Sequence, residues 1–159
     1  MKKIVLILIP LIFISCQQEN KTRQIGELFF ETYSKRIEPE KMLSFYSSDF
    51  QYRDVVFGSE TNDPKVLFQK FYGWNDPNLR YESEHSIIID EMISNDSSII
   101  AKGKTHSYTY SGKFVPGVNF IIWLKLDENM KVKEQTDWFD YSLEEIIEAH
   151  KIKESLEIK

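Results

Sequence analysis

The segment from Gly112 to Tyr141 constrains the fold most, because it contains two long strand-like runs joined by a short polar turn. Every second residue from Val118 to Leu126 is apolar, and the positions between them include Asn119 and Lys125. This period of two is typical of a strand with one buried face. Asp127-Glu128-Asn129 supplies the turn, and a second run follows it. The segment therefore predicts an antiparallel pair of strands.

Helical patterns precede these strands. Apolar residues recur at three- and four-residue intervals over positions 23–37, which predicts an amphipathic helix. Pro39 is suited to open a short second helix, because proline is tolerated at the first helical position. After an extended run at positions 50–57, Asn62-Asp63-Pro64 combines an N-cap residue with a proline and predicts a third helix that ends near Gly73.

The second half of the chain reads as strands. From Leu79 to Ile89, residues such as Leu79 and Tyr81 alternate with charged residues such as Arg80, which predicts a strand. A turn follows at Ser94–Ser97, and Ile99–Tyr110 is predicted to be the partner strand. Together with the first pair, this gives four long strands in sequential order. Ser142 and Glu145 have the spacing of a capping box at the start of a last short helix.

The order of these elements predicts an α+β fold. Four strands in sequence form an antiparallel meander, and the N-terminal helices must cover its apolar face. Gly103 and Pro116-Gly117 are suited to the bends of a strongly curved sheet, whose concave side would leave a cone-shaped cavity. The 159 residues, with 42% apolar composition, suit one domain, and a net charge of −5 argues against nucleic acid as a partner.

The N-terminus has the pattern of a secretory leader. Two lysines precede an apolar run at positions 4–14, which is too short to span a bilayer. Phe13-Ile14-Ser15-Cys16 resembles the lipobox of bacterial lipoproteins, in which the cysteine is lipid-modified, and Cys16 is the chain's only cysteine. We expect a signal peptide at 1–15, a tether at 16–22, a domain at 23–150 and a charged tail at 151–159. The resemblance implies an extracytoplasmic protein attached to a membrane through Cys16.

The order of helices and strands from about residue 25 to 149 resembles the NTF2-like superfamily. Within it, the pattern is most similar to the SnoaL-like branch of polyketide cyclases, ketosteroid isomerases and limonene epoxide hydrolases. Tyr52-Arg53-Asp54 resembles the Tyr-x-Asn of the hydrolase, and Asp137 in Asp-Trp-Phe-Asp resembles its last-strand aspartate. The counterpart of the hydrolase's Arg-x-Asp is Lys104-Thr105-His106, which contains neither residue and argues against epoxide hydrolysis.

Three residues are candidates for acid–base chemistry. Asp137 stands beside two aromatic residues, and a half-dry cavity would disfavour its charged form. Asp54 and His106 are the other two candidates. Each has a structural alternative: a strand-end carboxylate bonded to backbone or hydroxyl groups, and a histidine satisfied within the core.

A second group of residues is expected to contact a ligand in the cavity. Aromatic side chains can line an apolar pocket, although each is equally suited to an ordinary core. No close pair of metal-ligand residues is present, so neither a metal nor a cofactor is expected. The expected ligand-binding residues are Tyr52, Trp74, His85 and Trp138, with Tyr72 and Trp123 as further aromatic candidates.

Three functions remain open at this point. The first is a lipid-anchored module that binds a small apolar or amphipathic molecule. The second is a SnoaL-like isomerase, cyclase or hydrolase that uses Asp137 as acid or base. The third is an interaction domain that forms a homodimer through the convex face of the sheet, where Trp123 and Lys125 would lie. A fold hosts many functions, so the resemblance alone does not choose among them.

Overall fold

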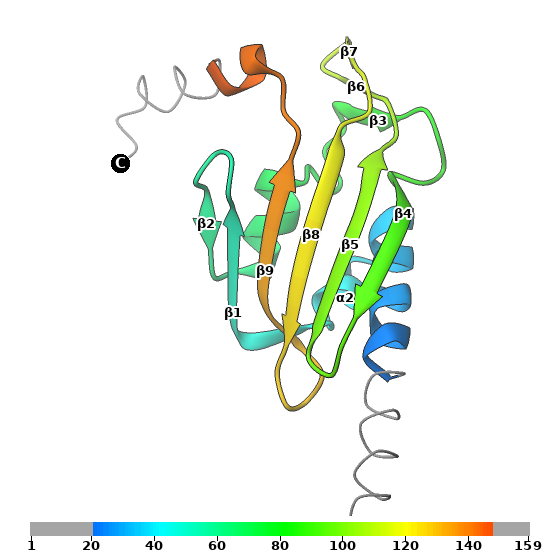
Figure 1. The fold of residues 1–159 in the computed structure, drawn as a ribbon. Coiled ribbons are helices and arrows are strands. Elements are labelled where there is room, and N and C mark those ends of the chain that lie inside the picture. Colours follow the sequence, from blue (N-terminus) through cyan, green and yellow to red (C-terminus); the bar gives the residue numbers. More distant parts are fainter. Residues whose placement is uncertain (1–20, 148–159) are drawn as a thin grey trace, which may run out of the picture.

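The computed structural model describes residues 21–147 of the chain. A six-stranded curved sheet in the order β2-β1-β9-β8-β5-β4 forms one layer, and helices cover one of its faces (Figure 1). Cys16 and the charged tail lie outside the described residues. The strands of this sheet are β1 (Tyr46–Asp54), β2 (Glu60–Thr61), β4 (Ile87–Ser94), β5 (Ser98–Thr105), β8 (Asn119–Leu126) and β9 (Val132–Phe139).

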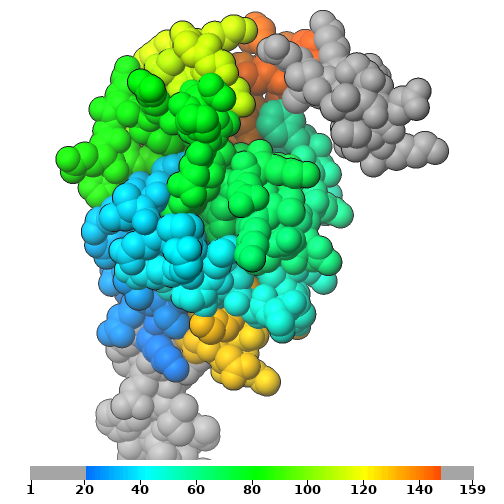
Figure 2. All heavy atoms as spheres, turned by 180° about the vertical axis from the view of Figure 1, so that it is seen from behind, coloured from blue at the N-terminus to red at the C-terminus, as the bar shows by residue number. Residues whose placement is uncertain are grey.

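The helical layer comes mostly from the first half of the chain. A helix at residues 21–35 is followed by α2 (Pro39–Leu43), which has proline at its start as expected. The third helix combines α3 (Pro64–Val66) with a wider π-helical turn, η1 (Leu67–Phe71), and Gly73 takes a positive φ of 55° just beyond it. Figure 2 shows these helical segments side by side on this face.

The predicted meander of four strands is confirmed. Strands β4, β5, β8 and β9 are antiparallel neighbours in that order. The turn between β8 and β9 is the expected one, because Asp127 Oδ1 accepts hydrogen bonds from Asn129 N at 2.9 Å and Lys131 N at 2.8 Å. The capping box also forms: Ser142 N donates to Glu145 Oε2 at 2.8 Å, and Glu145 N donates to Ser142 Oγ at 3.2 Å.

The sheet has one parallel pair that the meander pattern did not predict. β1 begins at Tyr46, earlier than the expected Phe50, and pairs in parallel with β9. In this register, Asp54 lies opposite Asp137. At the end of the pair that contains Asp54 and Asp137, both strands bury every second residue. Both carboxyl groups are therefore on the buried face. This pairing between distant parts of the chain brings the two candidate carboxyl groups onto neighbouring strands.

Two of the expected long strands are interrupted. The strand predicted over Leu79–Ile89 consists of β3 (Leu79–Tyr81) and the first part of β4, and the strand predicted over Ile99–Tyr110 breaks after Thr105. β6 (Tyr108–Tyr110) instead joins β3 and β7 (Lys113–Val115) in a separate small sheet. At the break, Ser86 N donates to Ser34 O and His106 N donates to Ser86 O, so backbone groups bond across the bend. The small sheet lies beyond one end of the large sheet (Figure 1).

The core lies between the large sheet and the helices. Gly103 on β5 is required there, because a Cβ at this position would lie 2.1 Å from Ile88 O. The register of β4 against β5 shifts beside it, between Ile89 and Glu91, which is the local irregularity expected for a curved sheet. The largest fully buried apolar side chains are Phe29, Met42, Phe50, Leu67, Ile99, Ile122, Leu124 and Val132.

The opposite face of the sheet carries aromatic and aliphatic groups. Trp123 lies opposite Ile100 in the register of β8 with β5, and Ile100 lies opposite Ile93, which is 60% exposed. Lys125 Nζ lies 5.0 Å from the centre of the Trp123 ring and 2.7 Å from Glu134 Oε2. Trp123 and Lys125 thus lie on the outer face, as the dimer hypothesis requires, and the homodimer stays a prediction.

Candidate functional site

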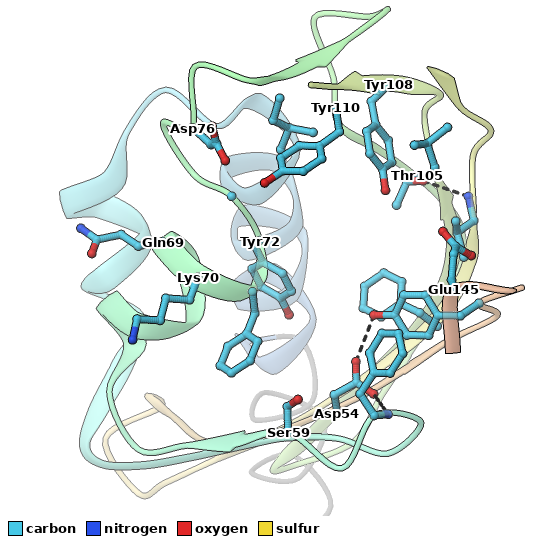
Figure 3. A pocket seen from close by; sticks show the side chains of 18 of the residues that line it. Asp54, Ser59, Gln69, Lys70, Tyr72, Asp76, Thr105, Tyr108, Tyr110 and Glu145 are labelled. Atoms are coloured by element: carbon cyan, nitrogen blue, oxygen red, sulfur yellow. Dashed lines mark hydrogen bonds between the residues drawn. The ribbon is translucent and has the colours of Figure 1, made fainter. Parts of the chain in front are cut away.

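A cavity of about 470 Å³ lies at the end of the domain where the small sheet meets the large sheet and the helical layer. Ten of its 21 lining residues are aromatic, and Figure 3 shows the side chains around it. Seven of the eight tyrosines of the chain contribute to its wall. The aromatic lining residues are Tyr33, Tyr52, Tyr72, Tyr81, Tyr108, Tyr110, Tyr141, Phe57, Phe71 and Phe139.

The π-helical turn positions Tyr72 in this wall. Tyr72 N donates to Leu67 O at 3.1 Å, which is the wide hydrogen bond of a π-turn. Arg36 then holds the following backbone, because its Nη2 donates to Tyr72 O at 3.0 Å and to Gly73 O at 2.7 Å. The Arg36 guanidinium also stacks over the rings of Trp74 and Tyr81. Its Nη2 group and its flat face are therefore engaged by the protein.

Asp137 lies directly behind this wall and is fully buried. Its carboxylate accepts hydrogen bonds from Tyr72 Oη and from Gln135 Nε2, the latter at 3.0 Å to Oδ1. Tyr46 Oη donates to Gln135 Oε1 at 2.7 Å and thereby fixes the amide. Gln135 Nε2 also donates to Tyr72 Oη at 2.6 Å. The four side chains form one buried polar network, which reaches the cavity wall through Tyr72.

The buried network shifts the titration of its members. Burial raises the pKa of Asp137 to about 7, although hydrogen bonds from Tyr72 and Gln135 act in the opposite direction. The charge of Asp54 adds to the rise. Burial also raises the pKa of Tyr72 and Tyr52 far above the usual range. These phenols therefore stay neutral and keep their protons for hydrogen bonding.

Asp54 lines the cavity, although it is only 3% exposed. Its Oδ1 accepts hydrogen bonds from Val56 N at 2.8 Å and Phe57 N at 2.9 Å, which is the pattern of a turn-stabilising aspartate. Its Oδ2 accepts a hydrogen bond from Tyr141 Oη at 3.0 Å, which Figure 3 marks. Since a carboxylate offers about four acceptor sites, these three hydrogen bonds leave part of the acceptor capacity of Asp54 unused.

The two tryptophans expected at the cavity do not line it. Trp74 follows the end of η1, so it leaves the face of that helix and packs behind the wall, with its ring centre 5.1 Å from that of Phe68. It is 4% exposed and belongs to the core. Trp138 is adjacent to Asp137 on β9 and lies opposite Ile121, so the alternation of a strand places it on the other face.

The two candidate histidines also lie away from the cavity wall. His85 is exposed, and its Nδ1 lies 3.1 Å from Ser34 Oγ. His106 is half-buried at the bend between β5 and β6. Neither lines the cavity, whereas Tyr52 and Asp54 do. Within residues 21–147, no group of three potential metal-ligand residues is close enough to hold a metal ion.

Several tyrosines of the wall were not singled out from the sequence. The small sheet supplies two of them through the Tyr-Thr-Tyr alternation of β6, which places both tyrosines on one side of the strand. The sequence signal that could have indicated these wall residues is the number of tyrosines, which is eight in the chain. Their convergence depends on the bends after Tyr81 and Thr105, which alternation does not reveal. The lining residues added by the structure are Tyr33, Tyr81, Tyr108, Tyr110 and Tyr141.

Comparisons with known proteins identify the fold. No family model and no curated protein matches the sequence. Among solved structures, a candidate SnoaL-like polyketide cyclase from Shewanella putrefaciens is 16% identical, with a TM-score of 0.63 over 80% of this chain and 96% of that one. An M. tuberculosis epoxide hydrolase, described as LEH-like, is 11% identical, with a TM-score of 0.61 over 87% of this chain and 97% of that one.

A third similar structure is an NTF2-like protein from Burkholderia thailandensis. It is 14% identical and has a TM-score of 0.60 over 75% of this chain and 90% of that one. These solved structures share the arrangement of helices and sheet with this chain. At such low identities, the shared property is the fold, and the chemistry of the site has to be argued from the residues of this chain.

Proposed function

Starting from the NTF2-like fold of this chain, we propose that the domain binds a small molecule in its tyrosine-lined cavity. The observation that supports this proposal is the gathering of seven tyrosines around one space of about 470 Å³. Ligand pockets typically measure roughly 300 to 1,000 Å³ and combine apolar walls with a few polar groups. A tyrosine supplies both, because its ring is apolar and its hydroxyl forms hydrogen bonds. The ligand is therefore expected to be partly apolar and to carry at least one polar group.

The bonding of the two carboxyl groups favours binding over direct acid–base catalysis. A general base has to reach the proton that it removes. Asp137 is fully buried behind Tyr72, and its hydrogen bonds are made within the protein. Asp54 reaches the cavity, but three hydrogen bonds hold its carboxylate in place.

Acid–base catalysis through Tyr72 is the second candidate function. Tyr72 lines the cavity and donates a hydrogen bond to Asp137, whose pKa lies at about 7. In this case Tyr72 would donate its proton to a substrate and take a replacement proton from protonated Asp137, so Tyr72 would stay neutral and Asp137 would become the carboxylate. A pKa near the working pH is the condition under which acid–base catalysis is most efficient.

We also propose that Cys16 carries a lipid that attaches the domain to a membrane on the extracytoplasmic side. The support is the lipobox-like sequence before the chain's only cysteine. Among the described residues, no helix has both the length and the apolar character needed to cross a bilayer.

A fragment-binding experiment tests the cavity proposal. Val118→Trp places a large ring into the cavity wall, whereas Ile121→Trp places the same ring on the outer face of the same strand region, where Ile121 is 43% exposed. A fluorinated fragment library is titrated against wild type and both variants by ¹⁹F NMR. Fragments that bind wild type and Ile121→Trp but lose affinity at least about tenfold for Val118→Trp would support the proposal. Equal binding to all three proteins, or no binding to wild type, would contradict it.

A further inference from the structure

We propose that the ligand of the tyrosine-lined cavity is an organic cation, such as a substituted ammonium group. This inference rests on the proposed binding function and specifies the class of molecule that is bound. It follows from two independent properties of the wall, its aromatic surface and the sign of its charges.

The aromatic surface is suited to a positively charged group. The face of a phenol or phenyl ring carries negative electrostatic potential, so cations that have lost part of their water shell bind against it. The rings of Tyr52 and Phe71 are tilted neighbours, with their centres 5.6 Å apart, and Tyr72 lies edge-on to Tyr52 at 6.3 Å. Tyr81 and Tyr108 form a second tilted pair at 5.4 Å. A ligand between these pairs would contact rings on several sides.

The charged groups of the wall also favour a positively charged ligand. Asp54, Asp76 and Glu145 line the cavity, and Lys70 is the one basic residue among the lining residues. Asp54 is buried, so its charge acts through a medium of low polarity, where electrostatic interactions are stronger than in water. Lys70 is exposed, and in Figure 3 its side chain points away from the enclosed space. Water screens such a charge.

The Arg36 guanidinium does not reverse this balance. Arg36 is absent from the cavity wall, and its guanidinium donates to two backbone carbonyl groups and stacks on Trp74 and Tyr81. Among the described lining residues, an anionic ligand would therefore find only the exposed Lys70 as a positive partner. It would also face the charge of Asp54.

Asp54 offers a specific contact for the cation. Asp54 lines the cavity, and its Oδ2 accepts one hydrogen bond, from Tyr141 Oη, which leaves acceptor capacity on that oxygen. Tyr hydroxyl oxygens in the wall add further acceptors. A ligand with an ammonium head and an apolar or hydroxylated tail would satisfy the rings, the carboxylate and the hydroxyl groups at once.

Three probes of nearly equal shape separate the possible ligand classes. Choline carries a trimethylammonium group, 3,3-dimethylbutan-1-ol replaces its nitrogen with carbon, and 3,3-dimethylbutanoate is an anion with the same apolar head. The Kd of each is measured by NMR titration of the ring signals of isotope-labelled tyrosine. We expect choline to bind at least about tenfold more tightly than the alcohol and the carboxylate to bind weakest.

Variants of wall residues test whether the wall causes the preference for choline over the alcohol. Asp54→Asn is expected to reduce the preference for choline over the alcohol to below about threefold, whereas Asp90→Asn, an exposed acid on β4, is expected to retain it. If Asp54→Asn does not fold, Phe71→Leu provides the test, because Phe71 lines the cavity at 41% exposure. It should weaken choline more than the alcohol.

Two results would overturn the inference. Equal or tighter binding of the alcohol or the carboxylate in wild type would show that charge does not select the ligand, while the binding function itself would stand. Absence of choline binding together with absence of any fragment binding in the cavity would overturn the binding function as well.

Discussion

Replacing Asp137 with asparagine tests the buried network, because asparagine imitates the protonated acid at all pH values. The folded protein holds the pKa of Asp137 at about 7, against an ordinary value of 3.8. Below 3.8 the carboxyl group is protonated in both states. Between these values the unfolded chain loses a proton that the folded chain keeps, so the free energy of unfolding falls as pH rises. Above about pH 7 both states are ionised and the loss is complete.

The size of the effect follows from this difference. Between the two pKa values, an increase of one pH unit lowers the free energy of unfolding by about 1.4 kcal/mol. Most of the interval between pH 5 and pH 8 lies in this range. Asp137 is fully buried, so solvent does not screen the contribution. Wild type is therefore expected to lose about 2 to 3 kcal/mol of stability between pH 5 and pH 8 relative to Asp137→Asn. At pH 8 the variant is expected to be the more stable protein.

Urea denaturation at pH 5, 6, 7 and 8 measures this difference. Comparing the two proteins at each pH cancels the titration of groups that they share. Asp90→Asn, which removes an exposed carboxyl group on β4, controls for the general loss of a negative charge. If wild type and Asp137→Asn show parallel pH profiles, or if the variant is the less stable protein at pH 8, the reasoning about the buried carboxyl group is wrong.

Three further predictions address the fold, the second carboxyl group and the membrane anchor. Gly103→Ala should lower stability by at least about 2 kcal/mol in urea denaturation, because its Cβ would lie 2.1 Å from Ile88 O; an unchanged midpoint would contradict the close approach of these strands. Tyr141→Phe removes the 3.0 Å hydrogen bond to Asp54 and should cost about 1 to 3 kcal/mol, seen as a lower Tm, whereas an unaltered Tm would show that this bond contributes little. Cys16→Ala should move the protein from the membrane fraction to the soluble fraction, and continued membrane retention of the variant would refute lipid attachment.

Local signals in the sequence were sufficient for much of the fold. The capping box at Ser142, the turn at Asp127 and the helix start at Pro39 each depend on a few neighbouring residues, and each forms as predicted. The four-strand meander follows from alternation combined with short turns, so it was predictable too. In these cases, the partner of each strand is its neighbour in sequence.

Features that depend on distant partners were not predictable in this way. The parallel pairing of β1 with β9 joins segments about 85 residues apart, and no turn signal specifies it. Alternation also continues through the bends that separate β3 from β4 and β5 from β6, so it predicted straight strands where the chain changes sheets. The same bends carry Tyr81 and Tyr108 to the cavity wall. Asp54 and Tyr52 were predicted at the site because they resemble a short motif, whereas most of the other tyrosines carry no such mark.

The most direct test of ligand binding in the tyrosine-lined cavity is an NMR experiment on protein labelled only at its tyrosine rings. Seven tyrosines line the cavity, and Tyr46, which is buried within the network behind it, serves as an internal reference. The protein is titrated with the tightest fragment found by the ¹⁹F screen. We predict that signals from the cavity tyrosines shift together with one Kd, while the Tyr46 signal shifts least. Binding that leaves the cavity tyrosines unchanged, or shifts only residues on the outer face of the sheet, would contradict the proposal that this cavity is the functional site.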